Sequence, residues 1–497
     1  MPRVLHPPQH VPAPAITVNL HRAAANWSRN RARAKTLVDW EGWRDRAQAI
    51  RADAVAHLPE LIEQAEERVT AAGGIVHHAA TAGDAARIVK ELCAARGATR
   101  AVKAKSMLTE EIGLNEALAE AGVESVETDL GEYVVQLMGD RPSHILAPAV
   151  HLSAGQVAEL FGGLAGEVFD PDDTQRLVAY ARAQLRDRFL AAEVGITGAN
   201  FLVAETGTLV LVESEGNIRL CTGLPRVHIA LVGIEKVLRD WEGAAHMVQM
   251  LPLAAHGRRT ATYHSYITGP ARDGDDGPEE LHVVLVDDGR AALRGTELES
   301  ALNCIRCGAC LYACPVYRQT GGHAYGSAYS GPIGAVITPA LEDYENHSGE
   351  LAWMSSLCGA CAEACPVKIP LDEQLVIIRA GARERDPKPA EAAFFEAWSR
   401  LWSRPSAYRA TAATGGKVLA PLWAKAARAM AGASGANDAP ADGGHAVPGA
   451  GGAPGGTDGD AQWLPRVPVP FAGWTKARDV RQPAAEPFHA RWRKRRG

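Results

Sequence analysis

Seven of the nine cysteines in this 497-residue sequence lie close together, at spacings that favour iron–sulfur chemistry. The first four follow the pattern C-x2-C-x2-C-x3-C-P from Cys304 to Pro315, which is typical of bacterial two-cluster ferredoxins. Three thiolates two residues apart can each reach a different iron on one face of a cubic cluster, and Gly308 lets the backbone approach it. The fourth cysteine of such a run points away and ligates a second cluster.

A second, shorter motif runs from Cys358 to Pro366 and matches the last three cysteines of the same pattern. Ser355 stands where the first cysteine would be. If the cysteine before each proline serves the opposite cluster, the ligands divide into two sets. Cluster 1 takes Cys304, Cys307, Cys310 and Cys365, and cluster 2 takes Cys314, Cys358 and Cys361.

Cluster 2 therefore has three cysteine ligands, which leaves two forms open. It is either a [4Fe–4S] cluster whose fourth ligand is water or Ser355, or a [3Fe–4S] cluster; we favour two [4Fe–4S] clusters in the chain. Zinc also binds C-x2-C pairs, but seven cysteines with two Cys-Pro ends fit iron–sulfur clusters better. Clusters that only stabilise the fold are a further alternative, although two adjacent clusters favour electron transfer.

The segment before these motifs is predicted to be an α/β domain. Between residues 65 and 290, short apolar runs alternate with helical stretches, as expected for a largely parallel sheet. One helix is expected after the cap residue Thr81 and another around Glu110–Ala121. The expected strands are 75–78, 101–104, 123–128, 201–212, 227–232 and 283–286.

The whole chain is expected to contain six segments. They are an N-terminal extension with helices (1–64), the α/β domain (65–290), a helical two-cluster iron–sulfur domain (295–385), C-terminal helices (386–431), a disordered linker (432–462) and a docking tail (463–497). Residues 1–20 are expected to be extended and 27–72 helical. The basic residues Arg22, Arg29, Arg31, Arg33 and Lys35 are interpreted as a solvated helix face.

Candidate binding residues of the α/β domain surround a Glu-Thr-Gly-Thr turn that begins at Glu205. A Gly-Asn-Ile-Arg segment is expected to close the hairpin and to bring Asn217 and Arg219 near Glu205. An acid, an amide and a guanidinium together could bind a small carboxylate, with a structural ion pair as the alternative. Lys103, Lys105 and Ser106 form a second candidate anion site. His323, between the cysteine motifs, is expected to form a local hydrogen bond.

Composition excludes several classes of function. The net charge of −6 gives no argument for nucleic-acid binding. No apolar run is long enough for a transmembrane helix, and the N-terminus lacks the pattern of a secretory signal, so we expect a cytoplasmic protein. Phosphate-binding and dinucleotide-binding glycine motifs are not found, and no flavin fingerprint is visible.

Taken together, these motifs and their order resemble lactate utilization protein B, the iron–sulfur subunit of a bacterial L-lactate oxidation complex. The α/β domain, with its Glu205 turn and the segment Gly216–Arg219, is similar to that family's lactate-utilization (LUD) domain. This domain is in turn similar to the CoA-transferase and sugar-phosphate isomerase type of fold. The region from Cys304 to Pro366 resembles the family's helical ferredoxin-like module, and the segment 471–479 resembles its C-terminal region.

The resemblance implies an electron-transfer subunit that helps to oxidise L-lactate to pyruvate as a carbon source. It also implies two companion subunits: a cysteine-rich protein of the heterodisulfide-reductase type and a second LUD protein. Three alternatives remain open: electron transfer from another hydroxy acid, such as glycolate or glycerol phosphate; acyl or CoA transfer with Glu205 as nucleophile; and a regulatory iron–sulfur sensor. The last is disfavoured because the sequence has no DNA-binding motif.

Overall fold

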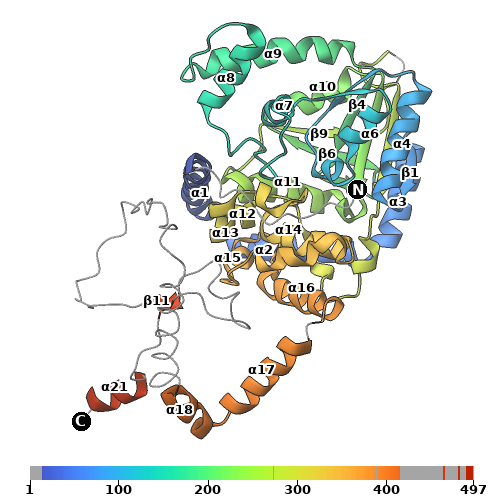
Figure 1. Ribbon diagram of the computed structural model, residues 1–497. Coiled ribbons are helices and arrows are strands. Elements are labelled where there is room, and N and C mark those ends of the chain that lie inside the picture. Colours follow the sequence, from blue (N-terminus) through green and yellow to red (C-terminus); the bar gives the residue numbers. More distant parts are fainter. Residues whose placement is uncertain are drawn as a thin grey trace. The chain divides into compact units, whose positions relative to one another are not determined.

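The computed structural model describes residues 14–272, 274–387, 389–414, 463–464, 480–481 and 488–495. The chain divides into two compact units, residues 1–386 and 387–497. Figure 1 shows the first unit, with a parallel sheet and its helices on one side and the helices of the cysteine region on the other.

The first unit is built on a six-stranded parallel sheet in the order β1-β10-β7-β4-β2-β3. Its strands are β1 (Ile75–Ala79), β10 (Glu280–Val286), β7 (Val227–Gly233), β4 (Val194–Gly198), β2 (Arg100–Lys103) and β3 (Glu124–Glu127). All seven residues of β7 are buried, as expected for a central strand that has both faces covered. The predicted α/β domain with a parallel sheet is therefore confirmed.

Helices cover both faces of this sheet and connect its strands. They are α4 (Ala82–Ala95), α5 (Met107–Glu111), α6 (Leu114–Glu120), α7 (Leu130–Leu137), α8 (Ala154–Ala165), α9 (Thr174–Ala191), α10 (Asn217–Gly223) and α11 (Trp241–His256). Thr81 caps α4 by accepting a hydrogen bond from the Asp84 amide, as predicted. The helix expected over 110–121 is instead two short helices, because Gly113 takes a left-handed conformation between them.

A second sheet of four strands packs beside the first, in the order β8-β5-β6-β9. Its strands are β5 (Phe201–Val203), β6 (Thr208–Glu213), β8 (Val237–Leu238) and β9 (Tyr263–Ile267). The strand candidate 201–212 is divided into β5 and β6 by the expected Glu-Thr-Gly-Thr turn, with Gly207 at positive φ, so the predicted turn is confirmed. The hairpin is not closed by residues 216–219, because Gly216 instead begins α10 and β6 pairs with β9.

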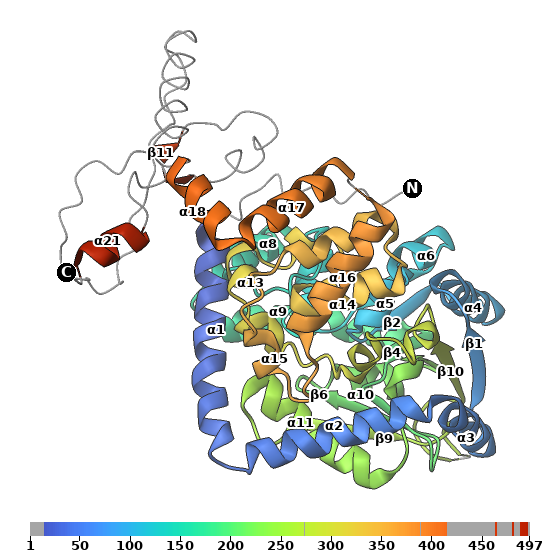
Figure 2. The same ribbon diagram turned by 90° about the horizontal axis from the view of Figure 1, so that it is seen from below.

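Three helices precede the first sheet: α1 (Pro14–Lys35), α2 (Trp40–Ala56) and α3 (Leu58–Ala71). The expectation that residues 1–20 are extended is wrong for residues 14–20, where Leu20 is buried on the first turns of α1. Trp27 of α1 donates a hydrogen bond to the Ala254 carbonyl, at 3.1 Å, and so fixes α1 against α11. Figure 2 shows α1 and α2 meeting at a corner and framing the helices of the cysteine region.

The cysteine region consists of short helical segments that share one apolar core with the α/β domain. They are the 3₁₀ helices η2 (Ala291–Leu293), η3 (Glu299–Asn303), η4 (His323–Tyr325) and η5 (Glu345–Trp353), and the α-helices α12 (Ala309–Ala313), α13 (Pro315–Thr320), α14 (Gly331–Leu341), α15 (Ala360–Ala364) and α16 (Leu371–Arg385). One further 3₁₀ helix, η1 (Ile234–Lys236), follows β7. The predicted helical iron–sulfur region is confirmed.

The second unit contains α17 (Pro389–Trp402), α18 (Pro405–Thr414), the short antiparallel pair β11 (Trp463–Leu464) and β12 (Val480–Arg481), and α21 (Phe488–Arg495). Aromatic rings pack along α17 and α18, with the rings of Trp398 and Trp402 4.9 Å apart. The predicted helix around 417–430, the linker 432–462 and most of the tail lie outside the described residues.

Candidate functional site

The two cysteine motifs form matching turns that face each other. Gly308 and Gly359 begin α12 and α15 in a left-handed conformation, directly after Cys307 and Cys358. Six of the seven motif cysteines are buried, and Cys358 is exposed. A side chain at Gly308 would lie 2.8 Å from the ring of His144, so glycine is required for this close approach.

The thiols divide into two groups by their electrostatic influence on one another. Besides burial, the nearby thiols of Cys304, Cys307 and Cys365 raise the pKa of Cys310. In the other group, burial and then Cys358 raise the pKa of Cys314, and Cys314 raises that of Cys361. The thiol of Cys365, from the second motif, therefore lies with the first motif, as the exchange of fourth ligands requires.

The spacing of the thiols suits a cluster better than a single ion. Four thiolates on one zinc ion, with bonds of about 2.3 Å, lie about 3.8 Å from one another. Among the described residues, the groups of three or more ligands within 4.8 Å of one another contain no cysteine. The cysteines are therefore clustered, but their sulfur atoms lie further apart than they would around a single ion. This separation leaves room for a larger group, such as an iron–sulfur cluster.

Burial keeps these thiols protonated when no metal is bound. It raises the pKa of Cys307 to about 12 and that of Cys365 to about 11. Coordination to iron must therefore expel protons, which couples cluster insertion to pH. Cys358 differs, because hydrogen bonds from the Ala360 amide and the Ser356 side chain lower its pKa.

Cationic side chains surround the Cys304 group and bind the backbone of its loops. Arg31 donates to the Ala364 carbonyl at 2.8 Å, Arg44 to that of Cys365 at 2.9 Å, and Lys236 to that of Cys304 at 3.0 Å. Arg51 is fully buried and donates to the Leu302 carbonyl at 2.9 Å, and burial lowers its pKa to about 10. The charges of the three arginines offset those of four gathered thiolates, whereas burial lowers the pKa of Lys236 to about 7, so that this side chain is only partly charged at neutral pH.

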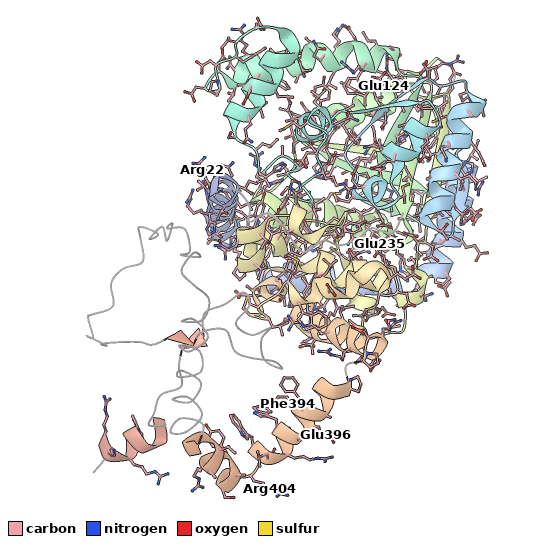
Figure 3. The ribbon with its side chains drawn as sticks, in the orientation of Figure 1. Arg22, Glu124, Glu235, Phe394, Glu396 and Arg404 are labelled. Atoms are coloured by element: carbon pink, nitrogen blue, oxygen red, sulfur yellow. The ribbon has the colours of Figure 1, made fainter. Side chains whose placement is uncertain are left out.

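Arg31 corrects one prediction. The basic residues of α1 were expected to form a solvated face, and Arg22, labelled in Figure 3, is exposed as expected. Arg31 is instead buried beside the second motif, with its guanidinium 4.9 Å from the ring centre of Trp27 and 5.3 Å from that of Trp40. Its side chain serves the cysteine site rather than solvent.

Tyr325 lies between the two groups of thiols. It is fully buried, and its pKa is raised by burial and then by Cys314, Cys310 and Cys361, which belong to both groups. Its hydroxyl has no hydrogen-bond partner in the described part of the chain. Because buried hydroxyls are normally paired, this orphan donor fits a cluster sulfide as its acceptor.

A cavity of about 470 Å³ connects the α/β sheet to the Cys304 loop. Residues 104–106 and 197–199 line it together with Gly233, Glu235 and Lys236, and they lie at or just beyond the carboxyl ends of β2, β4 and β7. Ile305, Arg306 and Tyr329 line it from the cysteine region. Ligands of open parallel α/β sheets bind at this edge, so the cavity is the expected place for a substrate.

Charged groups of the cavity form a network around Glu235, which Figure 3 labels in the interior of the unit. Glu235 pairs with Arg290 at 2.7 Å, and Arg290 also pairs with Glu111 at 2.7 Å. Burial opposes ionisation of Glu235, but Arg290 and Lys236 outweigh it and lower the pKa of Glu235 to about 2. Glu235 therefore holds a fixed negative charge at neutral pH.

Arg306 is a cation of this network that has a hydrogen-bond donor left over. Its Nη2 is 3.4 Å from Glu235, and its guanidinium lies 4.4 Å from the ring centre of Tyr329. Its Nη1 is buried and has no partner among the described residues. Because Arg306 stands between Cys304 and Cys307, an anion bound to it would lie beside cluster 1.

The predicted trio of Glu205, Asn217 and Arg219 is not brought together. Glu205 lies in the turn before β6, whereas Asn217 and Arg219 follow the other end of that six-residue strand, about 20 Å away. Glu205 accepts a hydrogen bond from the Trp241 amide and does not line the cavity. Glu205 therefore lies outside the cavity in which a substrate of the acyl- or CoA-transfer alternative would be expected.

Arg219 and Asn217 have separate roles. Arg219 pairs with Glu213 at 3.1 Å and lies over the ring of Tyr263 at 4.0 Å, which is the structural ion pair considered as the alternative. Asn217 lines the cavity and donates to Thr128 at 3.2 Å.

The three residues of the second candidate anion site, Lys103, Lys105 and Ser106, do not lie together. The first is in the protein interior and the other two line the cavity. Lys103 is fully buried, 2.7 Å from Glu127 and 3.3 Å from Glu110. Although burial alone would lower its pKa, these carboxylates raise it, so Lys103 is a buried ion-pair partner. Lys105 and Ser106 line the cavity, as an anion site requires.

Two further residues named from the sequence form hydrogen bonds. Ser355 accepts a local one from the Leu357 amide at 3.1 Å. The Nε2 atom of His323 lies 2.7 Å from the Arg141 carbonyl, which is 182 positions away, so the hydrogen bond expected of His323 is formed but is not local. Arg306, Lys236, Glu235 and Arg290 were not identified from the sequence. The position of Arg306 inside the first motif was the one signal that could have identified it.

The parallel α/β sheet and the gathered cysteines define an iron–sulfur protein with an attached α/β domain. Comparison with family models agrees: the LUD domain matches residues 62–286, and the 4Fe-4S dicluster domain matches residues 300–369. The thiol groups and the orphan hydroxyl of Tyr325 fit bound clusters.

Relatives extend the match to most of the chain. Lactate utilization protein B of Shouchella clausii is 43% identical over 91% of this chain and 88% of its own length. The protein of the same name from Bacillus subtilis is 46% identical over 71% of this chain and 74% of its own. The uncharacterized electron transport protein YkgF of Escherichia coli is 44% identical over 72% and 76%. The chain belongs to the lactate utilization protein B family.

Membrane insertion was tested on the helices themselves. Within the described ranges, every helix is too short or too polar to cross a bilayer.

Proposed function

We propose that this chain is the electron-transfer subunit of a complex that oxidises L-lactate to pyruvate. The observation that carries the proposal is the cavity whose wall is completed by Arg306, a residue of the first cysteine motif. The proposal places the substrate-binding edge of the α/β domain next to a redox centre. The names of the relatives, which refer to lactate utilization and electron transport, support it.

We assign two [4Fe–4S] clusters to the seven cysteines. Cluster 1 takes Cys304, Cys307, Cys310 and Cys365, and cluster 2 takes Cys314, Cys358 and Cys361, with a fourth ligand that is not cysteine. The two groups of thiols support this assignment. When bound, each cluster supplies a one-electron acceptor, so two clusters match the two electrons that a hydroxy acid releases.

The chain's own residues prepare the cavity for an anionic hydroxy acid. Arg306 pairs with the carboxylate through its free Nη1 atom, and the fixed charge of Glu235 holds the guanidinium in place. Oxidation to the oxo acid also releases two protons. Glu215 lines the cavity and has a pKa raised by burial and by Asp129, which suits it to accept one of them.

Cluster 2, which Cys314, Cys358 and Cys361 would hold, would supply the exit for electrons, because its ligand Cys358 is the exposed one. Cys358 is exposed, and Trp353 and Leu357 beside it are 50% and 37% exposed. We propose that the companion subunits, a cysteine-rich protein of the heterodisulfide-reductase type and a second LUD protein, assemble with this chain and take the electrons here.

The division of labour is tested on protein purified without oxygen. The chain alone should show cluster signals by electron paramagnetic resonance (EPR) after reduction, but little lactate oxidation until its companions are added. Full turnover by the isolated chain would contradict the proposal. A colourless or zinc-loaded protein would overturn the assignment of clusters.

The substrate site is tested with Arg306→Gln in the reconstituted complex. The KM for lactate should rise at least tenfold while the cluster signals remain, because a carboxylate loses a charged partner. The matched control is Arg226→Gln. Arg226 is an exposed arginine that pairs with Glu279, and it directly precedes β7, at the end of the strand away from the cavity. An unchanged KM in Arg306→Gln would show that the substrate does not bind in this cavity.

Another hydroxy acid, of the glycolate or glycerol phosphate type, is the second candidate, because a cavity of about 470 Å³ does not select a three-carbon acid by its size. Growth of a deletion strain on lactate, glycolate or glycerol phosphate as carbon source separates the two. A defect confined to lactate supports L-lactate as substrate, whereas a defect confined to another acid replaces it.

A further inference from the structure

Asp140, His151 and His323 meet at a point away from the cysteines and from the large cavity. Nε2 of His151 is 3.1 Å from one carboxylate oxygen of Asp140, and Nε2 of His323 is 3.7 Å from the other. The same Nε2 of His323 lies 2.7 Å from the Arg141 carbonyl, a contact that a bound ion would replace. One ligand atom from each residue lies within 4.8 Å of the other two. His151 and Asp140 belong to the α/β domain, whereas His323 belongs to the insertion between the cysteine motifs.

The three side chains form a ligand set of two imidazoles and one carboxylate. Metal bonds of about 2.0–2.1 Å place neighbouring ligand atoms about 2.9–3.4 Å apart. The 3.1 Å separation lies in this range, and the 3.7 Å separation exceeds it by a few tenths of an ångström. The hydrogen bond from His151 lowers the pKa of Asp140, so the carboxylate is ionised at neutral pH.

The loops that carry these residues are fixed to each other before any ion binds. The Gly322 amide donates to the Ser143 hydroxyl at 3.2 Å, and the Tyr317 hydroxyl donates to the Ser143 carbonyl at 2.7 Å. A side chain at position 322 would lie 1.8 Å from that carbonyl, so only glycine allows His323 this approach. Prearranged ligands reduce the cost of binding an ion.

A second cavity, of about 280 Å³, adjoins two of the three residues. Asp140 and His323 line it, together with Glu110, Glu116 and the basic residue Arg141. Its three acidic residues outnumber the one arginine and favour a cation, and its volume leaves room for water or a small ligand at further coordination positions.

We propose that Asp140, His151 and His323 bind one divalent transition-metal ion of the zinc or manganese type. The ion fastens the insertion to the α/β domain and keeps open positions that face the second cavity. Two imidazoles and a carboxylate suit such ions, whereas calcium and magnesium prefer oxygen ligands alone. The site is independent of the proposed electron transfer.

The experiment uses the full chain, purified without oxygen and with its clusters intact. Protein is incubated with Zn²⁺ or with Mn²⁺, desalted, and analysed for bound metal, iron and sulfide. We expect one equivalent of added metal in the wild type and at least a tenfold loss of affinity in His323→Ala and Asp140→Asn. The matched control is His78→Ala, an exposed histidine that pairs with Glu66 at 2.9 Å, and it should bind as the wild type does.

Iron and sulfide contents separate this site from the clusters, because they should be equal in all four proteins. Binding of less than one equivalent by the wild type, or equal binding by His323→Ala, would overturn the proposal. Binding that falls in step with iron content would also overturn it, since the added metal would then occupy cluster sites. If a variant unfolds, His323→Gln, which keeps a polar side chain, provides the second test.

Discussion

The guanidinium of Arg44, on helix α2, donates a hydrogen bond to the main-chain oxygen of Cys365 at 2.9 Å. The two residues are 321 positions apart in the sequence. A helix that precedes the α/β domain thus supplies a buried positive charge to the loop that carries the last cysteine of the second motif. The N-terminal helices are therefore part of the redox site.

Replacement of Arg44 by glutamine should lower the reduction potential of cluster 1. The oxidised and reduced clusters differ by one negative charge, and a nearby cation stabilises the reduced form. The expected shift is on the order of tens of millivolts in an EPR-monitored titration. Arg46→Gln, on the same helix and paired with Glu242 at the surface, should leave the potential unchanged. Equal potentials in the two variants would show that Arg44 acts only on packing.

Replacement of Cys365 and of Cys361 by alanine should affect different clusters. Under the exchange of ligands, Cys365→Ala removes a ligand of cluster 1 and Cys361→Ala one of cluster 2, although both belong to the second motif. Iron analysis and EPR should show a different signal disturbed in each variant. Cys93→Ala, outside both motifs, should retain both signals. The same signal lost in both motif variants would refute the exchange.

Replacement of Tyr325 by phenylalanine removes a hydroxyl that has no partner in the described chain. If that hydroxyl donates to a cluster sulfide, its loss should lower the potential of that cluster by an amount on the order of tens of millivolts. The control is Tyr317→Phe, whose hydroxyl is already bound to the Ser143 carbonyl. The control variant should have a lower thermal midpoint and unchanged reduction potentials for both clusters. If neither variant shifts a potential, the Tyr325 hydroxyl does not donate to a cluster.

Acid should destabilise the α/β domain through His228. This residue is fully buried in β7, its Nε2 lies 2.8 Å from the Thr197 hydroxyl, and burial lowers its pKa to about 3. Below an unfolded-state pKa near 6.5, the unfolded chain binds a proton that the folded chain rejects, so stability is complete above that pH and falls below it. The loss at pH 5.5 is about 1.4 kcal/mol.

Thermal unfolding at pH 7.5 and 5.5 measures this effect, and His228→Asn provides the comparison. The variant is expected to be less stable at both pH values but to lose less on acidification. If the stability of the wild type and that of the variant depend on pH in the same way, groups other than His228 cause the acid sensitivity.

The cysteine region was predictable because its information is local. A thiolate pattern such as Cys304 to Cys314 specifies a loop around a cluster whatever surrounds it. The cavity could not be predicted in the same way, because Lys236 and Cys304 meet only through the fold. The same holds for the approach of His323 to Asp140, which depends on how two distant loops pack.

Most strands were identified from their apolar runs, but β4 was missed because glycine interrupts its run. The structure explains that glycine: a side chain at Gly195 would lie 1.8 Å from the Cys221 carbonyl of α10. The start of α1 was missed for a different reason. Its β-branched residues have low helix propensity, and packing of Leu20 and Trp27 against other elements outweighs it.

The common apolar core has a consequence for how the protein is made. Leu20 of α1 and Ile378 of α16 belong to one continuous set of buried side chains. During synthesis, the first helices leave the ribosome long before their partners exist and must wait with apolar surface uncovered. Delivery of iron and sulfide would then complete a unit whose first and last helices share one core, so a cell starved of iron would accumulate an unfinished and degradable polypeptide.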